Sequence, residues 1–291
     1  MAAIDLQRPV KFERIMLATD FSPASEIAQA YAVGLALHYS STLELATIVD
    51  LSLTLPSMEV IHESTLEALR RTSENDLRRL AEHIAGITVT RKVIEGFQPA
   101  SLIVEEAVNS NADLIVLGTT SKHGFKKLAL GSTAEAVIRT APCPILTVGP
   151  HVLPPPNFPV CFERIVYATD FSSQASKAAG LALSLGQTCG AKVYLCHVLT
   201  EEDKLNHDDS EARSISSLEA LIPESVHDWC NPKCIVEHGK SSEAILALAS
   251  RVNADLIVLG ARKPSFWVEY VRTGLTPALL AAANCPVLTV C

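Results

Sequence analysis

The stretch ADLIVLGTTSKHGFKKLALGSTAEAVIRTAPCPILTV, residues 112–148, decides the fold of this chain. It opens on an apolar run that ends in Gly118, which is typical of a strand buried on both faces of a parallel sheet. Ser132 and Glu135 then form a capping-box pattern, in which Ser132 caps a helix and the Glu135 side chain reaches back to it. Because the stretch ends on a second short apolar run, it predicts strand, loop, helix and strand in succession.

Two glycines, Gly118 and Gly131, flank the loop of this stretch. A glycine adopts backbone conformations closed to other residues and lets the chain approach a ligand. A helix N-terminus carries free N–H groups and a partial positive charge, so Gly131, Ser132 and Thr133 form a candidate anion site facing the end of the Gly118 strand. Ordinary turn and cap chemistry is the alternative interpretation of the same residues.

The spacing within this stretch resembles the nucleotide-binding signature of the universal stress protein family, which reads Gly-x2-Gly-x9-Gly followed by Ser or Thr. Here the signature positions hold Gly118, Ser121, Gly131 and Ser132, so the spacing is intact and Ser121 replaces the second glycine. The sequences ATDFS after the first predicted strand and APCP before the last one add to the resemblance.

The chain contains a long internal repeat. FERIMLATDFS at residues 12–22 returns as FERIVYATDFS at 162–172, and the run at 112–118 returns letter for letter at 254–260. Because the period is the size of a domain, the repeat predicts a tandem pair of domains and not a solenoid. The proline-rich GPHVLPPPNFP between the copies is typical of a stiff extended spacer. The expected organisation is a domain at residues 1–150, a linker at 151–160 and a domain at 161–291.

Strands and helices alternate strictly along the first copy, which indicates an α/β fold with a parallel sheet and helices on both faces. The resemblance implies that each domain is a five-stranded sheet of order 3-2-1-4-5, an adenine-nucleotide α-hydrolase-like relative of the Rossmann fold. The strands are expected at residues 14–19, 43–49, 88–94, 113–118 and 144–148, and the first and third helices at 23–40 and 99–109. A long second helix is expected to carry one apolar face, formed by Leu66, Leu69, Leu77, Leu80 and Ile84.

Composition and charge limit the class of partner. The chain is 48% hydrophobic and 19% charged, which describes a well-packed soluble protein. Its net charge of -8 opposes nucleic acid or an anionic membrane as the main partner, because neither would attract an acidic chain. Residues 1–14 contain no apolar segment of signal-peptide length, and no run approaches the roughly 18 apolar residues that span a membrane. We therefore expect a cytoplasmic protein.

The cysteines allow two interpretations. The chain has 8 cysteines, most of them in apolar runs, and we interpret them as reduced buried thiols and not as a disulfide framework. His227, Cys230, Cys234 and His238 are all of zinc-ligand type and lie close together in the sequence. Against zinc, residues 233–237 read as a strand, which would spread the four side chains poorly for a tetrahedron.

In a sheet of this order the ligand crevice lies beyond the carboxyl ends of the first and fourth strands. Topology alone therefore brings Asp20 and Gly118 to one place. Asp20 can accept hydrogen bonds from ribose hydroxyls or lie near a metal ion on the phosphates. The local alternative is that Asp20 only satisfies the turn into the next helix, since it precedes Ser22 by two positions.

The resemblance implies a role for several positions of the first copy. Ala18, Thr19 and Asp20 match the strand end that meets the nucleoside, with Asp20 on the ribose side. Ile48 matches the position that holds the adenine. The phosphate cradle corresponds to Gly118, Ser121, Gly131, Ser132 and Thr133. Extra positive charge near the phosphates, or a solvated loop face, is expected from Lys122, Lys126 and Lys127.

The second copy departs from this pattern. Its equivalents of the nucleoside positions and the first glycine are Asp170, Val198 and Gly260, but Lys263 stands at the second glycine. Thr273 and Gly274 replace the Gly-Ser pair that opens the helix of the first copy.

The residues that follow in the second copy also differ. Thr276 and Pro277 read as a cap followed by a first-turn proline, which would start the helix about three residues later and delete an amide donor. We therefore expect ATP, with or without Mg²⁺, in the N-terminal domain and an empty C-terminal crevice.

No catalytic signature stands out, since the chain lacks a P-loop and a G-x-S-x-G elbow. The leading hypothesis is a cytoplasmic ATP-binding universal stress protein that acts as a nucleotide-dependent sensor or regulator. The alternatives are an interaction module that binds no nucleotide and a slow ATP hydrolase. The resemblance further implies that the two domains pair through their last strands, residues 144–148 and 286–290, and leaves room for a homodimer.

Overall fold

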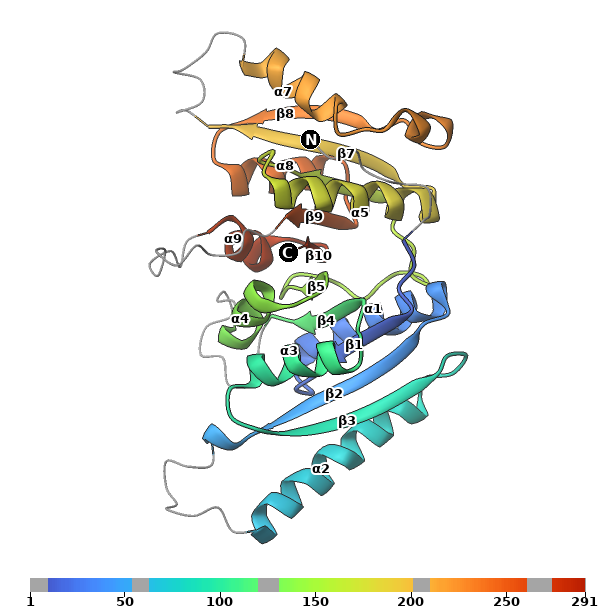
Figure 1. Cartoon of the computed structure of the whole chain (residues 1–291), viewed down its shortest axis with the longest axis vertical. Helices are drawn as coiled ribbons and strands as arrows, with labels where there is room; N and C mark the ends of the chain where they lie inside the picture. The colour runs from blue at the N-terminus through green and yellow to red at the C-terminus, as the bar shows by residue number, and fades with distance from the viewer. Residues whose placement is uncertain (1–9, 54–62, 120–130, 201–209, 261–273, 291) are drawn as a thin grey trace. The chain divides into compact units, whose positions relative to one another are not determined.

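The computed structural model describes residues 10–53, 63–119, 131–200, 210–260 and 274–290. The chain divides into two compact units, which are shown in Figure 1. The N-terminal unit consists of Phe12–Pro150 and Pro154–Val160, and the C-terminal unit centres on Cys161–Cys291. Among the described residues, no helix combines the length and the apolar character that crossing a bilayer requires.

The N-terminal unit is built on a parallel sheet. In the part that the structure describes, its strands lie in the order β3, β2, β1, β4, β5. Leu17 at the centre of β1 lies between Leu45 of β2 and Val116 of β4, and all three side chains are fully buried. The bounds of the strands are β1 (Arg14–Ala18), β2 (Thr42–Asp50), β3 (Val89–Gly96), β4 (Leu114–Gly118) and β5 (Ile145–Val148).

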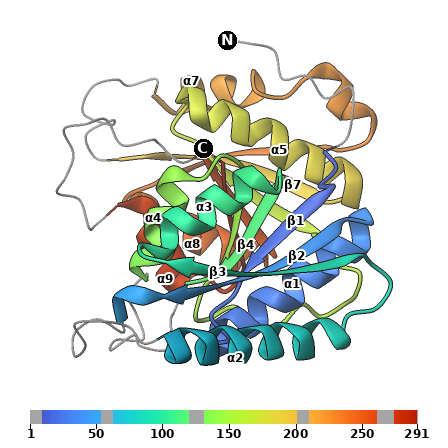
Figure 2. The ribbon, with the colours of Figure 1, turned by 60° about the horizontal axis from the view of Figure 1, so that its bottom comes forward.

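Helices cover both faces of this sheet, with α1 and α2 on one side and α3 and α4 on the other (Figure 2). Helix α1 begins where the sequence predicts it, because the Ser22 hydroxyl accepts the N–H of Ser25 at 3.3 Å and Pro23 takes the first helical position. The bounds are α1 (Pro23–Tyr39), α2 (Glu63–Glu82), α3 (Pro99–Asn109) and α4 (Ser132–Thr140), with a short 3-10 helix η1 (Leu51–Leu53).

Helix α2 carries the expected apolar stripe but buries little of it. Leu77 is the one residue of α2 that is fully buried, whereas Leu66 and Leu80 are half-buried and Leu69 is exposed. The helix packs along β2 and β3 at the outer side of the sheet, so part of its length faces solvent.

An aspartate fixes the start of β4 against β1. The strand expected at 113–118 begins one residue later, at Leu114, although the Asp113 N–H still donates to the Arg14 carbonyl at 2.8 Å. The Asp113 Oδ2 accepts the N–H of Glu13 at 2.8 Å and that of Arg14 at 2.9 Å. The second copy repeats this arrangement, since Asp255 accepts the amides of Glu163 and Arg164.

The C-terminal unit has the same topology. In its described residues the strands lie in the order β8, β7, β6, β9, β10, and all the recorded pairs are parallel. The strands are β6 (Arg164–Ala168), β7 (Lys192–Leu199), β8 (Lys233–His238), β9 (Leu256–Gly260) and β10 (Val287–Val290). The helices are α5 (Ser173–Cys189), α7 (Ser210–Glu219), α8 (Ser241–Arg251) and α9 (Leu275–Ala282), with the 3-10 helix η3 (Glu224–Asp228).

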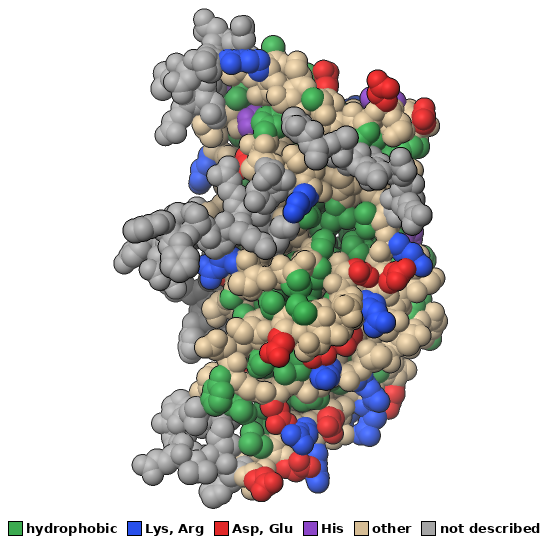
Figure 3. All heavy atoms as spheres, in the orientation of Figure 1, with side chains coloured by type: hydrophobic (Ala, Val, Ile, Leu, Met, Phe, Trp, Pro, Cys, Tyr) green, Lys and Arg blue, Asp and Glu red, His purple; other side chains and the backbone are tan. Residues whose placement is uncertain are grey.

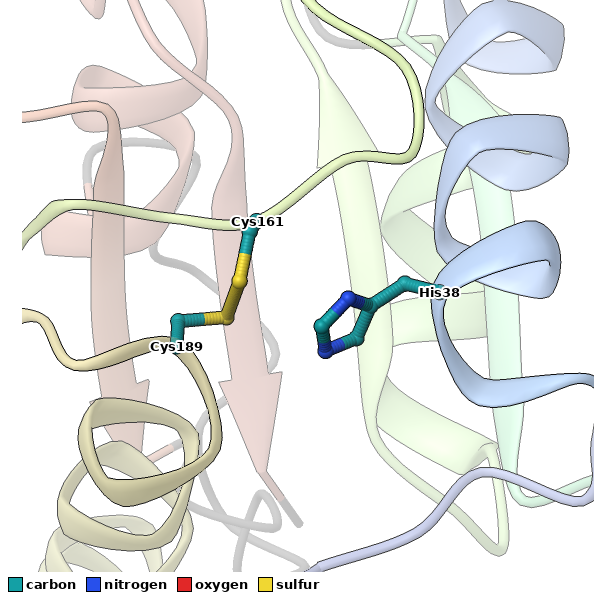
Figure 4. A group of neighbouring side chains, drawn as sticks. All are labelled: His38, Cys161 and Cys189. Atoms are coloured by element: carbon teal, nitrogen blue, oxygen red, sulfur yellow. A yellow bond between two sulfur atoms is a disulfide. The ribbon is translucent and has the colours of Figure 1, made fainter.

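The interpretation of all cysteines as reduced thiols is wrong for one pair. Cys161 and Cys189 form a disulfide (Figure 4), with Cα atoms 5.5 Å apart. Helix α5 runs back from the end of β6, so its last residue, Cys189, reaches the segment that enters β6. Of the other described cysteines, Cys196 and Cys285 are buried free thiols, as expected, whereas Cys143, Cys230 and Cys234 are half-buried free thiols. Burial raises the pKa of Cys196 to about 12.

Candidate functional site

Asp20 follows β1 directly and serves the turn into α1. Its Oδ1 accepts the N–H of Ser22 at 3.0 Å and the hydroxyl of Ser25 at 2.9 Å. This is the local role that the sequence offered as an alternative. The side chain is nevertheless exposed, and no described residue donates a hydrogen bond to Oδ2. One carboxylate oxygen therefore holds the turn while the other remains available to a ligand.

Gly118, the last residue of β4, lies against the first turn of α1. A Cβ atom at this position would lie 2.9 Å from the carbonyl carbon of Ala24 and 3.0 Å from the amide nitrogen of Ser25. Real Cβ atoms do not approach backbone that closely, so residue 118 must be glycine if helix and strand are to keep this spacing. The contact observed for this glycine is thus with the protein's own helix.

Gly131 joins the start of α4 to the end of β4. Its N–H donates to the carbonyl of Thr119 at 2.9 Å, and a Cβ atom at position 131 would lie 3.0 Å from the same oxygen. The structure corrects the capping box here. Gly131 is the N-cap, Ser132 is the first helical residue, and the Glu135 carboxylate contacts Arg139 at 3.2 Å instead of reaching back.

The first turn of α4 presents amide donors. The first hydrogen bond at this end of α4 runs from the N–H of Glu135 to the carbonyl of Gly131 at 3.0 Å. The amides of Ser132 and Thr133 precede it and lie outside the ladder of the helix. Thr119 adds a polar group nearby: its side chain is 3% exposed, and its Oγ1 has no hydrogen-bond partner among the described residues.

These contacts connect the carboxyl end of β1 to the start of α4. The Asp20 carboxylate accepts the Ser25 hydroxyl, and the backbone of Ser25 packs against Gly118. Thr119, which follows Gly118, accepts the N–H of Gly131. The carboxylate at the end of the first strand and the opening turn of α4 are therefore parts of one local structure. Ser121, Lys122, Lys126 and Lys127 lie outside the described residues.

The remaining nucleoside positions lie along the neighbouring strand ends. Ala18 pairs with Ala46 of β2 and Leu117 of β4, and the Thr19 N–H donates to the Ala46 carbonyl at 2.9 Å. Ile48 lies two positions beyond Ala46 on β2 and is half-buried. The structure thus places Ala18 and Thr19 beside Asp20, and Ile48 further out on the next strand.

A small cavity of about 280 Å³ borders this region. Thr19 and Phe21 line it together with residues of α1 and of the last turn of α2. Neither Gly118 nor the start of α4 belongs to its lining. Sequence reasoning missed Phe21, which has a φ of 56°, because nothing in the letters marks a left-handed phenylalanine.

The C-terminal unit keeps part of this arrangement. The Asp170 Oδ1 accepts the N–H of Ser172 at 3.0 Å, as Asp20 does in the first copy. The expected helix start three residues late is wrong: Gly274 is the N-cap and Leu275 is the first residue of α9. Pro277 stands in the first turn and removes one amide donor there.

A ring pair marks the strand ends of the C-terminal unit. His197 and Phe171 lie with ring centroids 4.5 Å apart, and the His197 Nδ1 bonds to the Thr169 carbonyl at 2.8 Å. Nδ1 therefore carries the proton, since a carbonyl only accepts. The register of the strands places Thr47 at the position of His197 in the first copy. Val198 follows His197 and is buried, and Lys263 lies outside the described residues.

The four candidate zinc ligands do not converge in the described structure. No three of their ligand atoms lie within 4.8 Å of one another. His227 belongs to η3, Cys234 lies inside β8, and the Cys230 thiol points to the Ala191 carbonyl at 3.6 Å. His238 at the end of β8 contacts Glu211 at 3.4 Å.

Comparisons with known proteins agree with the fold. The model of the universal stress protein family matches residues 11–149 and 162–290. A universal stress protein of Methanocaldococcus jannaschii is 35% identical over 146 residues, which cover 47% of this chain and 82% of that protein. A putative universal stress protein of Staphylococcus aureus (strain USA300) is 30% identical over 149 residues, 50% of this chain and 89% of that protein.

Solved structures show the same architecture over nearly the full length. A universal stress protein from Archaeoglobus fulgidus superimposes with a TM-score of 0.76 at 20% identity and covers 95% of both chains. A protein of unknown function from Pseudomonas aeruginosa gives a TM-score of 0.62 at 16% identity and covers 96% of this chain and 92% of that one. Since the family model matches both halves and the curated relatives are matched over most of their length, this chain belongs to the universal stress protein family.

Proposed function

We propose that the N-terminal unit binds an adenine nucleotide, ATP, and that the chain is a cytoplasmic, nucleotide-dependent sensor or regulator in a stress response. The observation that carries this proposal is the path of contacts from Asp20 through Ser25 and Gly118 to Gly131. It supports a single site with a carboxylate on one side and helix amides on the other.

Each group has a task that its chemistry fits. The free Oδ2 of Asp20 accepts a hydrogen bond from a ribose hydroxyl or lies near a metal ion carried by the phosphates. The amides of Ser132 and Thr133, with the partial positive charge of the α4 N-terminus, suit the phosphates. Ile48 offers an apolar contact for the adenine. No described residue of the site stands out as a base or nucleophile, so the proposal is binding and not turnover.

The C-terminal unit is proposed to bind no nucleotide. The Phe171–His197 ring pair occupies the ends of the strands β6 and β7, next to the position that corresponds to the adenine side. Pro277 also removes a donor from the first turn of α9. The two copies therefore offer different surfaces to a ligand despite their shared topology.

The first test is to denature the purified chain, identify any released nucleotide by mass spectrometry, and titrate the nucleotide-free protein with ATP by calorimetry. We expect one site per chain. Release of no nucleotide together with no binding heat would leave the interaction module as the function, and two equal sites would contradict the proposed asymmetry.

Two variants locate the site without removing the fold. Asp20→Asn keeps an acceptor oxygen for the turn and loses the charge, so we expect affinity for ATP to fall by about tenfold or more. Ser132→Pro removes one amide at the first helical position, where proline is tolerated, and is expected to weaken phosphate binding. Asp170→Asn is the matched control and should leave the affinity unchanged.

A further inference from the structure

The outer edge of the N-terminal sheet is open. In the described residues β3 pairs with β2 on one side and is the last strand on the other. The Leu43 N–H donates to the Thr88 carbonyl at 2.9 Å, and in a parallel pair alternate residues point their backbone groups to the same side. The amides and carbonyls of Arg91, Val93 and Glu95 therefore point away from β2. Such an edge is a template for another strand.

A groove of about 680 Å³ runs between this edge and α2. Its charged lining residues are Arg70, Glu74 and Arg78 of α2 and Arg91 and Glu95 of β3, and its apolar ones are Leu77 and Val93. Figure 3 shows acidic and basic side chains intermingled over the part of this unit where α2 and β3 lie. Because this groove remains open between α2 and β3, α2 leaves room for a strand that pairs with the outer edge of β3.

We propose that this edge pairs antiparallel with the same edge of a second copy of the chain. Consider the register in which Val93 lies opposite Val93 of the second copy. Arg91 then lies opposite Glu95 of the second copy, and Glu95 lies opposite its Arg91. All of these residues point their backbone groups outward, so the register places free donors and acceptors face to face. The contact closes on itself and forms a dimer, not a filament.

The charges of the edge favour this register. Arg91 is exposed and has no ion pair within the described residues. Glu95 is held at the edge by Arg70, whose Nε lies 2.5 Å from its Oε1. Charged residues normally keep sheet edges apart, but opposite charges directly across a pair of strands attract and like charges repel.

The corresponding outer strand of the C-terminal unit, β8, does not place opposite charges across such a pair. The Gly239 N–H donates to the Leu199 carbonyl at 3.0 Å, so the residues of β8 that point outward are Cys234, Val236 and His238. Antiparallel pairing centred on Val236 would place a thiol opposite an imidazole. The sequence of β3, and not the shared topology, therefore makes the first edge self-complementary.

The test is the solution mass of the full chain as a function of concentration, measured by sedimentation at about 0.15 M salt. We expect a reversible dimer of twice the chain mass of 31.2 kDa. Arg91→Glu and Glu95→Arg should each weaken the dimer by about tenfold or more, because symmetry introduces two like-charge contacts. The double variant Arg91→Glu/Glu95→Arg restores opposite charges and should regain most of the affinity.

Two further variants separate this edge from other surfaces. Val93→Pro deletes an outward amide without removing a bond to β2, and it should also weaken the dimer. Lys233→Glu on β8 is the control and should change nothing. A chain that stays monomeric at every concentration, or a dimer that ignores the charge reversals while circular dichroism shows an intact fold, would overturn the proposal. Its outcome does not depend on nucleotide binding.

Discussion

The end of β4 and the start of α1 touch at Gly118 and Ala24, where a Cβ atom on residue 118 would lie 2.9 Å from the Ala24 carbonyl carbon. This contact sets the distance between the Asp20 turn and the helix α4 that follows β4. The packing alone requires a glycine at the end of β4, whether or not a ligand binds there. The candidate site therefore depends on packing that is independent of its ligand.

Replacing this glycine should harm folding first. Gly118→Ala forces the strand and helix apart, and overpacking of this kind typically costs about 1–3 kcal/mol. Urea unfolding followed by circular dichroism measures the loss. Gly274→Ala is the control, because its Cβ would meet Pro277 at 3.6 Å, an ordinary contact. Equal stabilities for the two variants would contradict the close packing at Gly118.

The repeated aspartate before the fourth strand of each copy offers a second test. Asp113→Ala leaves the N–H groups of Glu13 and Arg14 without their acceptor, and we expect a loss of about 1–2 kcal/mol because water replaces part of it. Asp255→Ala should destabilise the C-terminal unit in the same way. The two tryptophans of the chain, Trp229 and Trp267, both lie in the second half of the sequence, so their fluorescence should respond to Asp255→Ala more than to Asp113→Ala.

The disulfide should stabilise one unit selectively. Cys161 and Cys189 are 28 positions apart, and closing a loop of that length contributes about 3–4 kcal/mol in the chain-entropy model. Reduction with a dithiol should therefore lower the denaturant midpoint of the tryptophan signal. The Cys161→Ser/Cys189→Ser variant should show the lower midpoint with or without reductant. A wild-type midpoint that ignores the reductant would argue against a stabilising cross-link.

Much of the fold could be predicted because its signals are local and repeated. The helix expected at residues 99–109 is confirmed as α3, since Pro99 marks its first position and the apolar run of β4 follows soon after. The carboxyl ends of β1 and β4 meet as the parallel order requires, which is why Asp20 and Gly118 could be placed together from topology.

The errors arose where a contact between distant segments decides the local structure. The capping-box sequence pattern predicts Ser132 as the N-cap, but Gly131 is the N-cap and its N–H donates to the Thr119 carbonyl. The sequence pattern carries no information about that contact. The disulfide was missed for a similar reason. Cys161 and Cys189 approach each other only because α5 runs back along the sheet from the end of β6.

Glu44 on β2 provides a pH-dependent prediction. Burial, and then the negative charge of Glu106 on α3, raise the pKa of the Glu44 carboxyl above its ordinary value of 4.5. The Ser110 hydroxyl, Lys92 and Arg14 oppose the shift. A raised pKa in the folded state means that the folded chain holds the proton more tightly than the unfolded chain. This stabilising contribution is complete below pH 4.5 and is lost as the pH rises through the folded pKa.

Glu44→Gln should therefore stabilise the chain at neutral pH, because the amide never has to carry a buried charge. The side chain is half-buried and partly screened by solvent, so we expect a gain of only a few tenths of a kcal/mol. The gain should shrink as the pH falls towards 4.5, which chemical unfolding at several pH values will show. Glu105→Gln, an exposed position on α3, is the control. A Glu44→Gln variant less stable than the wild type at pH 7 would mean that the interactions with Ser110, Lys92 and Arg14 outweigh the burial of the charge.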